Sequence, residues 1–211
     1  MKINYKKTKL MVFNPGIVRD IFPRYVFNGD ELEVVEESQL LGIILRNDLS
    51  WSSNTTYLVK KANKKLWTLR RLKRFGTKTN DLLDVYYKQI RNILEFAVPA
   101  WHPSLTSADR NRIERVQKSA LSIILGRSYK SYGWALKSLQ LETLFSRRKK
   151  LCKKFAKKCK MNSKFSKWFK PKIRKFPTRG IPPKIFCEVD ARLDRFKKSP
   201  INFLTKLLNN M

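Results

Sequence analysis

The chain has 211 residues, of which 42% are hydrophobic and 12% aromatic, so it can bury a core and form one or two domains. Its net charge of +31, from 47 Lys and Arg against 16 Asp and Glu, exceeds what solubility requires and disfavours a compact state through self-repulsion. These values exclude a disordered tail and predict an anionic partner.

Nucleic acid is the first choice of partner, because Trp, Tyr and Phe side chains lie among the cations and offer stacking surfaces. A membrane surface is the second choice and is disfavoured, since no uninterrupted apolar run approaches a spanning length. The start of the chain, MKINYKKTK, lacks a signal-peptide hydrophobic region, which predicts an intracellular protein of the nucleus or the cytoplasm.

The first residues, 1–52, are predicted to be a small antiparallel β segment. Residues 9–13 read as a strand, and the apolar-rich runs 24–27 and 32–35 flank an Asn-Gly pair, the strongest local hairpin signal. A compact apolar run follows at 40–45. So few short strands are not stable alone, and either the following helices or chain upstream must complete the sheet.

An amphipathic helix is predicted from Asn54 to Phe75, because its apolar residues recur on one side: Leu58, Ala62, Leu66, Leu69 and Leu72. Ser52, Ser53 and Asn54 are candidate N-caps, and Gly76 is placed for a left-handed C-terminal cap.

The opposite side of this helix carries Lys60, Lys64, Arg71 and Arg74, with Trp67 among them. Between Lys60 and Arg74 there are eight Lys or Arg residues and no Asp or Glu. Such a face is suited to phosphates, although a solvated basic face is the alternative. Trp67 either stacks on a base or packs against a second layer, and packing is the favoured reading.

Helices are predicted for the rest of residues 53–161, which we expect to form a bundle. They begin near Asn80, Ser107, Tyr132 and Glu142, and Pro99 and Pro103 stop the first of them. The helix from Ser107 ends at Leu125 before Gly126. The apolar stripe predicted for the last helix, residues 142–160, consists of Leu144, Leu151, Phe155 and Cys159.

Residues 162–211 are predicted to be a basic, proline-containing tail. Residues 162–184 read as an extended segment, and 201–208 as a short terminal helix. The whole chain is therefore expected to be α+β and mostly α, with the boundaries 1–52, 53–161 and 162–211.

No catalytic or metal site is predicted. Asp190 and Asp194 favour a surface ion-pair cluster with nearby arginines, and His102, the sole histidine, is expected to be a packed loop residue. Cys152 and Cys159 face inward on one helix, and no second histidine or Cys-x-x-Cys completes a zinc set. With Cys187 they are an odd number and fit reduced thiols.

Several stretches, in order and spacing, resemble the C-terminal third of reverse transcriptases from jockey-like non-LTR retrotransposons. They are KTKLMVF at 7–13, LLGIIL and LSW within 40–51, KKANKKLWTLRRLKR, FAVPAWHPSLT at 96–106, IERVQKSALSIILG at 113–126, and LETLFSRRKKL. The resemblance covers residues 3–152 and is specific as an ordered set.

The resemblance implies that residues 7–45 are the end of a polymerase palm and that the helices from Asn54 form a thumb, which holds a template-primer duplex by its backbone. Lys7 and Lys9 then join the helix residues as candidate nucleic-acid contacts. The family's Asp-Asp turn, which binds divalent metal such as Mg²⁺, is absent from this sequence.

We therefore expect a fragment that binds RNA, DNA or RNA-DNA duplex, that has no cofactor and that cannot polymerise without the upstream polymerase region. The alternative is a stand-alone basic RNA- or DNA-binding structural module.

Overall fold

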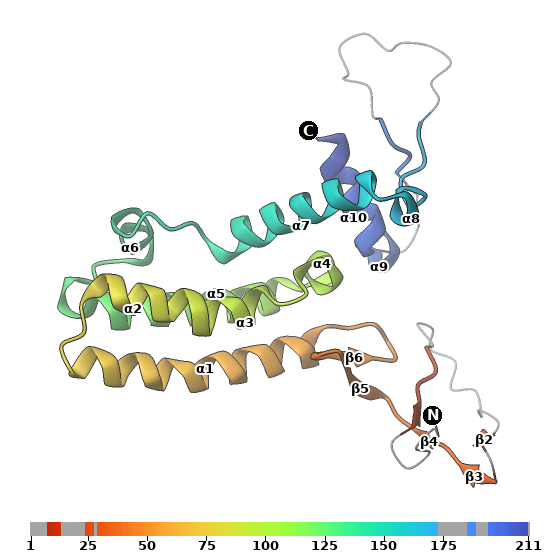
Figure 1. Cartoon of the computed structure of the whole chain (residues 1–211), viewed down its shortest axis with the longest axis horizontal. Helices are drawn as coiled ribbons and strands as arrows, with labels where there is room; N and C mark the ends of the chain where they lie inside the picture. The colour runs from red at the N-terminus through yellow and green to blue at the C-terminus, as the bar shows by residue number, and fades with distance from the viewer. Residues whose placement is uncertain (1–7, 14–23, 28, 173–184, 189–193, 211) are drawn as a thin grey trace. The chain divides into compact units, whose positions relative to one another are not determined.

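The structure, a computed structural model of the chain, describes residues 8–13, 24–27, 29–172, 185–188 and 194–210. Short strands precede a series of helices, which confirms the predicted α+β, mostly α class (Figure 1). The chain divides into two compact units, residues 1–57 and 58–211. The predicted boundary between residues 161 and 162 falls inside the second unit.

The first unit contains three strand pairs. β1 (Lys9–Leu10) pairs in parallel with β4 (Glu33–Val34), β2 (Val26–Phe27) pairs antiparallel with β3 (Asp30–Glu31), and β5 (Glu37–Leu40) pairs antiparallel with β6 (Ile43–Arg46). Phe27 pairs with Asp30 and Gly29 has a φ of 89°, which confirms the Asn-Gly hairpin. The predicted strand at 9–13 is shorter, and the β1–β4 pair shows that the segment is not wholly antiparallel.

The compact apolar run at 40–45 is divided between the end of β5, the connection after it and β6. Leu41 and Gly42 have φ values of 47° and 85° and connect β5 to β6. Two positive φ angles in a two-residue connection are typical of the turn whose twist matches that of a hairpin. Leu41, although apolar, is 88% exposed in this turn.

The helices follow, and most of them belong to the second unit. They are α1 (Ser52–Arg74), α2 (Thr79–Val85), the π-helix η2 (Tyr86–Arg91), α3 (Asn92–Glu95), α4 (Val98–Trp101), the 3₁₀-helix η3 (His102–Ser104), α5 (Ser107–Leu125), the 3₁₀-helix η4 (Gly126–Ser128), α6 (Tyr132–Ser138), α7 (Leu144–Met161), α8 (Ser163–Ser166), α9 (Asp194–Lys197) and α10 (Pro200–Asn209).

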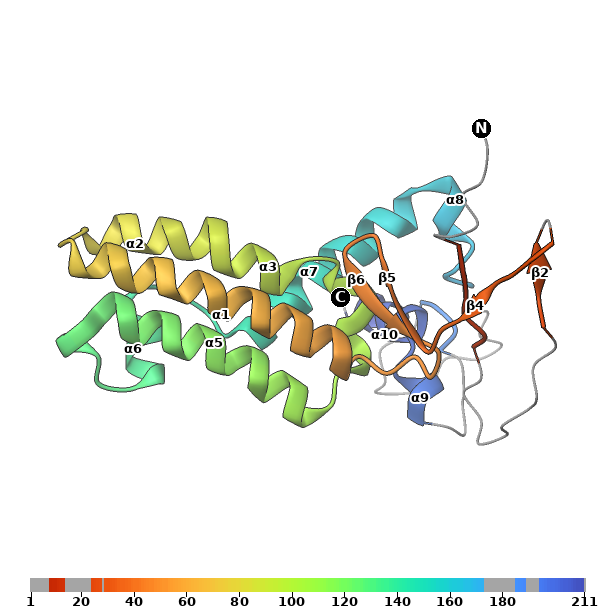
Figure 2. The same ribbon diagram turned by 90° about the horizontal axis from the view of Figure 1, so that it is seen from below.

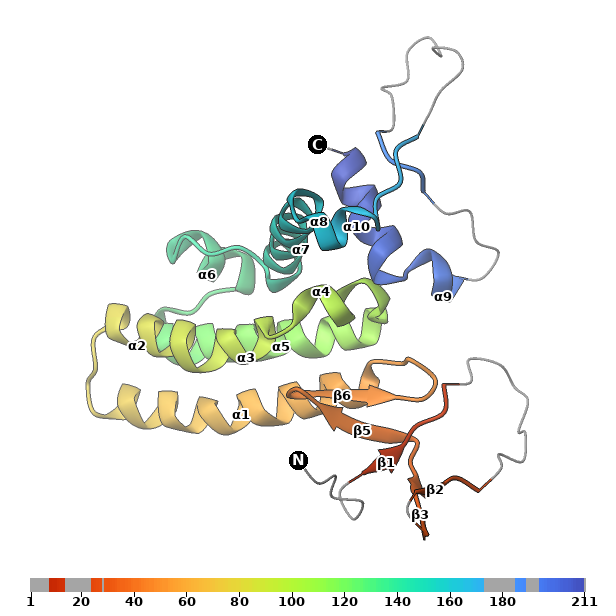
Figure 3. The ribbon, with the colours of Figure 1, turned by 45° about the vertical axis from the view of Figure 1, so that its right-hand side comes forward.

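Three layers of helices build the second unit. Residues 58–74 of α1 lie along α2, α3 and α5, as the view from below shows (Figure 2). α7 lies on the opposite side of that middle layer and contacts α4, α5 and α10 (Figure 3). Within the described residues, no helix is both long and apolar enough to cross a membrane.

The apolar stripe of α1 is the part of the core that the sequence predicted best. Leu58, Ala62, Leu66 and Leu69 are at most 3% exposed, while Leu72 is half-buried. The C-terminal cap is also confirmed: Gly76 has a φ of 77°, its N–H donates to the Lys73 carbonyl, and the Thr77 N–H donates to the Leu72 carbonyl, a Schellman motif.

The predicted N-caps of α1 are wrong, because the helix begins at Ser52 and includes all three residues. Asn54 is buried, and its Oδ1 accepts a hydrogen bond from the Ile44 N–H at 3.1 Å. This side chain therefore holds β6 to the start of α1 within the first unit.

Pro99 and Pro103 do not end the helix that begins near Asn80. That helix already leaves the helical conformation at Phe96, and Ala97 has a φ of 49°. Pro99 lies in the first turn of α4 and Pro103 lies in η3, since proline is tolerated where no intrahelical N–H is needed.

The buried face of α7 differs from the predicted stripe. It consists of Leu144, Arg148, Cys152, Ala156 and Cys159, while Leu151 is half-buried and Phe155 is 38% exposed. The prediction passed over positions 148, 152 and 156 because an arginine in the middle of the row obscured the period.

The tail adds to this core. The terminal helix is confirmed as α10, which packs on α7 with Leu204 buried. The extended conformation predicted for 162–184 is wrong for Ser163–Ser166, which form α8, while 173–184 and Asp190 lie outside the described residues. Pro171 and Phe186 form a β-bridge, and the Phe186 N–H donates a 2.8 Å hydrogen bond to Asn209 Oδ1 on α10.

Candidate nucleic-acid interface

The predicted basic face of α1 forms one ridge, defined here by Lys60, Lys64, Trp67, Arg71 and Arg74. Successive members are three or four residues apart, so at 100° per residue they stay within about 40° of a single line along the helix. The ridge is about 21 Å long from first to last Cα at 1.5 Å per residue. All five side chains are exposed.

The ridge is exposed because the opposite side of α1 supplies the core. The helix contains no acidic residue, and its last turn holds Arg71, Lys73 and Arg74, where cations complement the helix dipole. A row of cations without internal carboxylates attracts an anion of similar extent, such as a sugar-phosphate backbone.

The middle of the ridge is an aromatic and cationic cluster. The Arg71 guanidinium carbon lies 4.8 Å from the centre of the Trp67 ring and 5.9 Å from that of Phe75. Trp67 is 57% exposed and Phe75 is 74% exposed, so the favoured prediction that Trp67 packs against a second layer is wrong. The sequence reasoning missed Phe75, which follows Trp67 at a spacing of eight residues.

Lys73 belongs to the same helix but has a structural role. Its Nζ donates a 2.8 Å hydrogen bond to the Ile124 carbonyl, near the end of α5. The carbonyls of the last helical turn lack partners within the helix, so this lysine caps α5 and is not part of the ridge.

The two lysines predicted from the N-terminal segment are not brought into the ridge by any described contact. Lys7 lies outside the described residues. Lys9 belongs to the first unit, where its Nζ lies 3.1 Å from Glu33 Oε2 in an exposed ion pair. Its contact with nucleic acid stays a prediction.

A second basic helix was not among the predicted nucleic-acid contacts. α7 contains no acidic residue and exposes, among others, Lys149, Lys154, Lys157, Lys158 and Lys160. Its lysines lie on several sides of the helix, and its exposed phenylalanines, Phe145 and Phe155, are followed at helical spacing by Lys149 and Lys158. We therefore treat α7 as a comparison surface for α1.

The core beneath α7 contains a buried cation. Arg148 is 0% exposed, and its Nε donates a 3.4 Å hydrogen bond to Nδ1 of His102, which is 2% exposed. His102 is buried as predicted, but it lies in the 3₁₀-helix η3 and not in a loop. Burial, together with the charges of Arg148 and Arg110, lowers the pKa of His102 to about 3. Burial lowers the pKa of Arg148 to about 10.

The cysteines do not gather with other metal-binding side chains. Cys152 and Cys159 are buried on α7, as predicted, and burial raises the pKa of the Cys152 thiol to about 12. In the part of the chain that the structure describes, no three His, Cys, Asp or Glu side chains are grouped so that they could hold a metal ion.

Comparison with known proteins gives no relative: no family model, no curated protein and no solved structure is significantly similar to this chain. The resemblance to reverse transcriptases thus stays a prediction from the sequence motifs.

Proposed function

We propose that this chain binds nucleic acid duplex through phosphate contacts along the ridge of α1, as the end of the palm and the thumb of a protein related to non-LTR reverse transcriptases. The observation that carries the proposal is the ridge itself: four exposed cations without acidic neighbours in their helix, spread over about 21 Å. The order of the sequence motifs supports the polymerase assignment.

The role proposed for the ridge is positioning and not chemistry. Lys and Arg side chains on a rigid helix attract the backbone and fix its orientation, whereas phosphates carry no base information. Two-metal phosphoryl transfer requires carboxylates that hold both ions, and the sequence contains no Asp-Asp pair. We therefore propose that polymerisation needs the upstream polymerase region.

The second candidate is a stand-alone RNA- or DNA-binding structural module. It is favoured by the compactness of residues 58–211, whose core includes Phe169, Phe186 and Leu204 from the tail. A genomic reading frame that continues upstream of Met1 into an Asp-Asp turn would favour the polymerase assignment, and a frame that does not would favour the module.

The test compares two variants that each lose four charges. In the ridge variant, Lys60, Lys64, Arg71 and Arg74 are replaced by Gln. In the control variant, Lys154, Lys157, Lys158 and Lys164 are replaced by Gln; all four are exposed, and three of them lie on α7. Both sets lie away from the buried stripes, so both variants should keep the fold, which circular dichroism checks.

Duplex affinity is then measured as a function of salt concentration. The slope of log affinity against log salt is about −0.9 per neutralised phosphate, so the loss of two to four contacts should flatten the slope by roughly 2 to 4 units in the ridge variant. The loss of affinity in the ridge variant should be similar for unrelated duplex sequences. Equal slopes for the two variants would show that α1 contributes only general charge, and the proposal would be wrong.

A further inference from the structure

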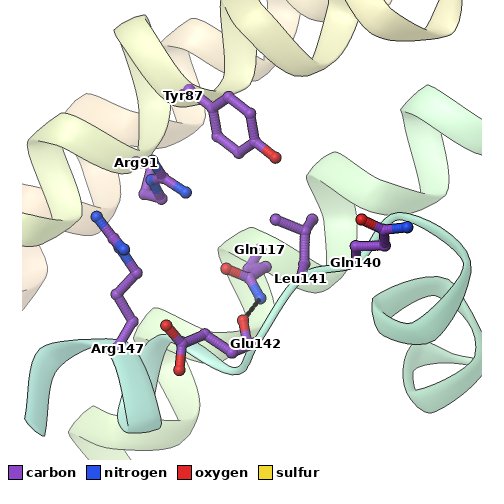
Figure 4. Close-up of a pocket in the computed structure, with 7 residues that line it drawn as sticks. All are labelled: Tyr87, Arg91, Gln117, Gln140, Leu141, Glu142 and Arg147. Atoms are coloured by element: carbon purple, nitrogen blue, oxygen red, sulfur yellow. Dashed lines mark hydrogen bonds between the residues drawn. The ribbon is translucent and has the colours of Figure 1, made fainter. Parts of the chain in front are cut away.

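A small cavity lies apart from the ridge, between η2, α5 and the start of α7. It has a volume of about 150 Å³ and is lined by Tyr87, Arg91, Gln117, Gln140, Leu141, Glu142 and Arg147 (Figure 4). The residues come from segments more than 50 positions apart in the chain, so no local sequence pattern predicts it.

Two guanidinium groups approach this cavity from different helices, Arg91 from η2 and Arg147 from α7 (Figure 4). Arg147 Nε donates to Glu95 Oε1 at 2.7 Å, and Arg91 Nε lies 3.6 Å from the same oxygen. One carboxylate is thus shared by two arginines. Arg91 Nε is buried and has no hydrogen-bond partner among the described residues.

The carboxylate on the cavity wall is already neutralised. Glu142 Oε2 lies 2.7 Å from Lys150 Nζ and accepts a 3.0 Å hydrogen bond from Ser146 Oγ. These partners lower the pKa of Glu142 against the opposing effect of its burial, so it is ionised at neutral pH. Arg91, Arg147 and Lys150 against Glu95 and Glu142 leave one positive charge in excess around the cavity.

The amide of Gln117 is fully used within the protein. Its Nε2 donates to the Tyr132 hydroxyl and to the Glu142 carbonyl, both at 3.0 Å, and its Oε1 accepts from the Tyr86 hydroxyl at 2.5 Å. Gln117 therefore fixes the wall of the cavity. The groups left to bind a guest are hydrogen-bond donors: the guanidinium ends of Arg91 and Arg147 and the Tyr87 hydroxyl.

We propose that this cavity binds one phosphate group, either free inorganic phosphate or the terminal phosphate of a nucleic-acid strand. Two guanidinium forks match the oxygens of a tetrahedral anion, and arginine binds phosphate through paired N–H groups where lysine offers a point charge. The volume of about 150 Å³ is below the several hundred Å³ of typical pockets for whole small molecules, so the guest is a phosphate and not a nucleoside.

Two backbone features support a site at this position. η2 is a π-helix of six residues, a rare conformation that occurs frequently at functional sites, and it carries both Tyr87 and Arg91. Gln140, on the rim, has a φ of 52° at the end of α6, where glycine is the usual residue. A glutamine that adopts this conformation costs about 1 kcal/mol and retains an amide at the rim.

The experiment is a thermal-unfolding titration of the full chain with inorganic phosphate, against potassium chloride at equal ionic strength. Any anion relieves the repulsion within a chain of net charge +31, so a control variant is needed. The deciding comparison is between Arg91→Gln and Lys118→Gln. Lys118 is an exposed residue of α5, and its replacement removes the same charge. We expect a saturable rise of Tm with phosphate in the wild type and in Lys118→Gln, and none beyond the chloride effect in Arg91→Gln.

Two further variants keep the test decisive if Arg91→Gln unfolds. Arg91→Lys retains the charge without the fork, and Tyr87→Phe removes one donor; each should weaken phosphate binding by about tenfold, the loss of one charge-assisted hydrogen bond. An equal phosphate effect in these variants and in Lys118→Gln, or no phosphate effect beyond chloride in the wild type, would overturn the proposal.

The source of the phosphate is resolved by duplexes with 5′-phosphate or 5′-hydroxyl ends. A preference of the wild type for the phosphorylated end, lost in Arg91→Gln, assigns the site to nucleic-acid ends. Equal affinity for both ends, with the inorganic phosphate effect intact, assigns it to free phosphate. The four-fold ridge variant should keep the phosphate effect, so this inference and the proposed function fail separately.

Discussion

The two long basic helices, α1 and α7, use the same kind of sequence in different ways. They have 23 and 18 residues, and neither contains an acidic side chain. α1 keeps all its cations out of its buried row in the second unit, which is apolar, whereas α7 includes Arg148 in the middle of its buried row. A charged residue can therefore be predicted to be exposed only when apolar residues already fill every position of the buried helix face.

The sharpest way to break this comparison is to truncate the core side of α1. Leu69 is 0% exposed, so Leu69→Ala should lower the free energy of unfolding by about 2–5 kcal/mol through lost burial and a cavity. Leu72→Ala, at a half-buried position of the same row, should cost less. Denaturant unfolding measures both, and equal losses would show that α1 does not pack as described.

The pair formed by Arg148 and His102 should make stability depend on pH. The folded-state pKa of His102, about 3, lies below its usual 6.5, so the unfolded chain takes up a proton first and stability is lost as pH falls from about 6.5 towards 3. Between pH 7 and pH 5 the loss from this residue should be about 2 kcal/mol.

His102→Gln is the matched control, because it keeps a polar group at the site and does not titrate. Its unfolding free energy should fall less than that of the wild type between pH 7 and pH 5. The carboxyl groups of Asp48 and Glu142 have lowered pKa values, so their contributions to stability are lost mainly below pH 4.5 and do not mask the effect of His102. Parallel pH curves for the two proteins would contradict the burial of a neutral His102.

The smallest expected change in unfolding free energy is a gain, whereas most core substitutions cause a loss. Both terminal nitrogens of Arg148 are buried without a hydrogen-bond partner among the described residues. Arg148→Met removes this desolvated charge but leaves His102 Nδ1 without its donor, and we expect a net gain of about 1 kcal/mol in unfolding free energy. A clear loss of stability would mean that the guanidinium has a partner of its own.

The sequence predicted those parts of the fold in which the hydrophobic period and the turn or capping residues indicate the same element. The stripe of α1 with Gly76, the helix Ser107–Leu125, the Asn-Gly hairpin and α10 are all of this kind. It missed the burial of Arg148, which lies on α7 where that helix contacts α4 and α10. Non-local packing decides such positions.

The candidate sites also differ in how far the sequence predicts them. The five ridge residues lie on one helix, so their alignment follows from the helical period alone. The exposure of Trp67 did not follow, because nothing in the local pattern tells whether another layer covers that face. The Arg91 and Arg147 cavity depends on contacts between distant segments and has no sequence signature.

The π-helix η2 also constrains how the length of this chain can vary. Its hydrogen bonds reach five residues back instead of four, so six residues occupy the span of fewer residues in an α-helix. Deleting one exposed residue of this segment, such as Lys88 or Gln89, would let it become a regular α-helix, and later positions would keep their places because the wide turn already absorbs an extra residue. Leu94 would stay in the core. A deletion in the regular turns of α2 has no wide turn to absorb it and would rotate every later position by about 100° around the axis.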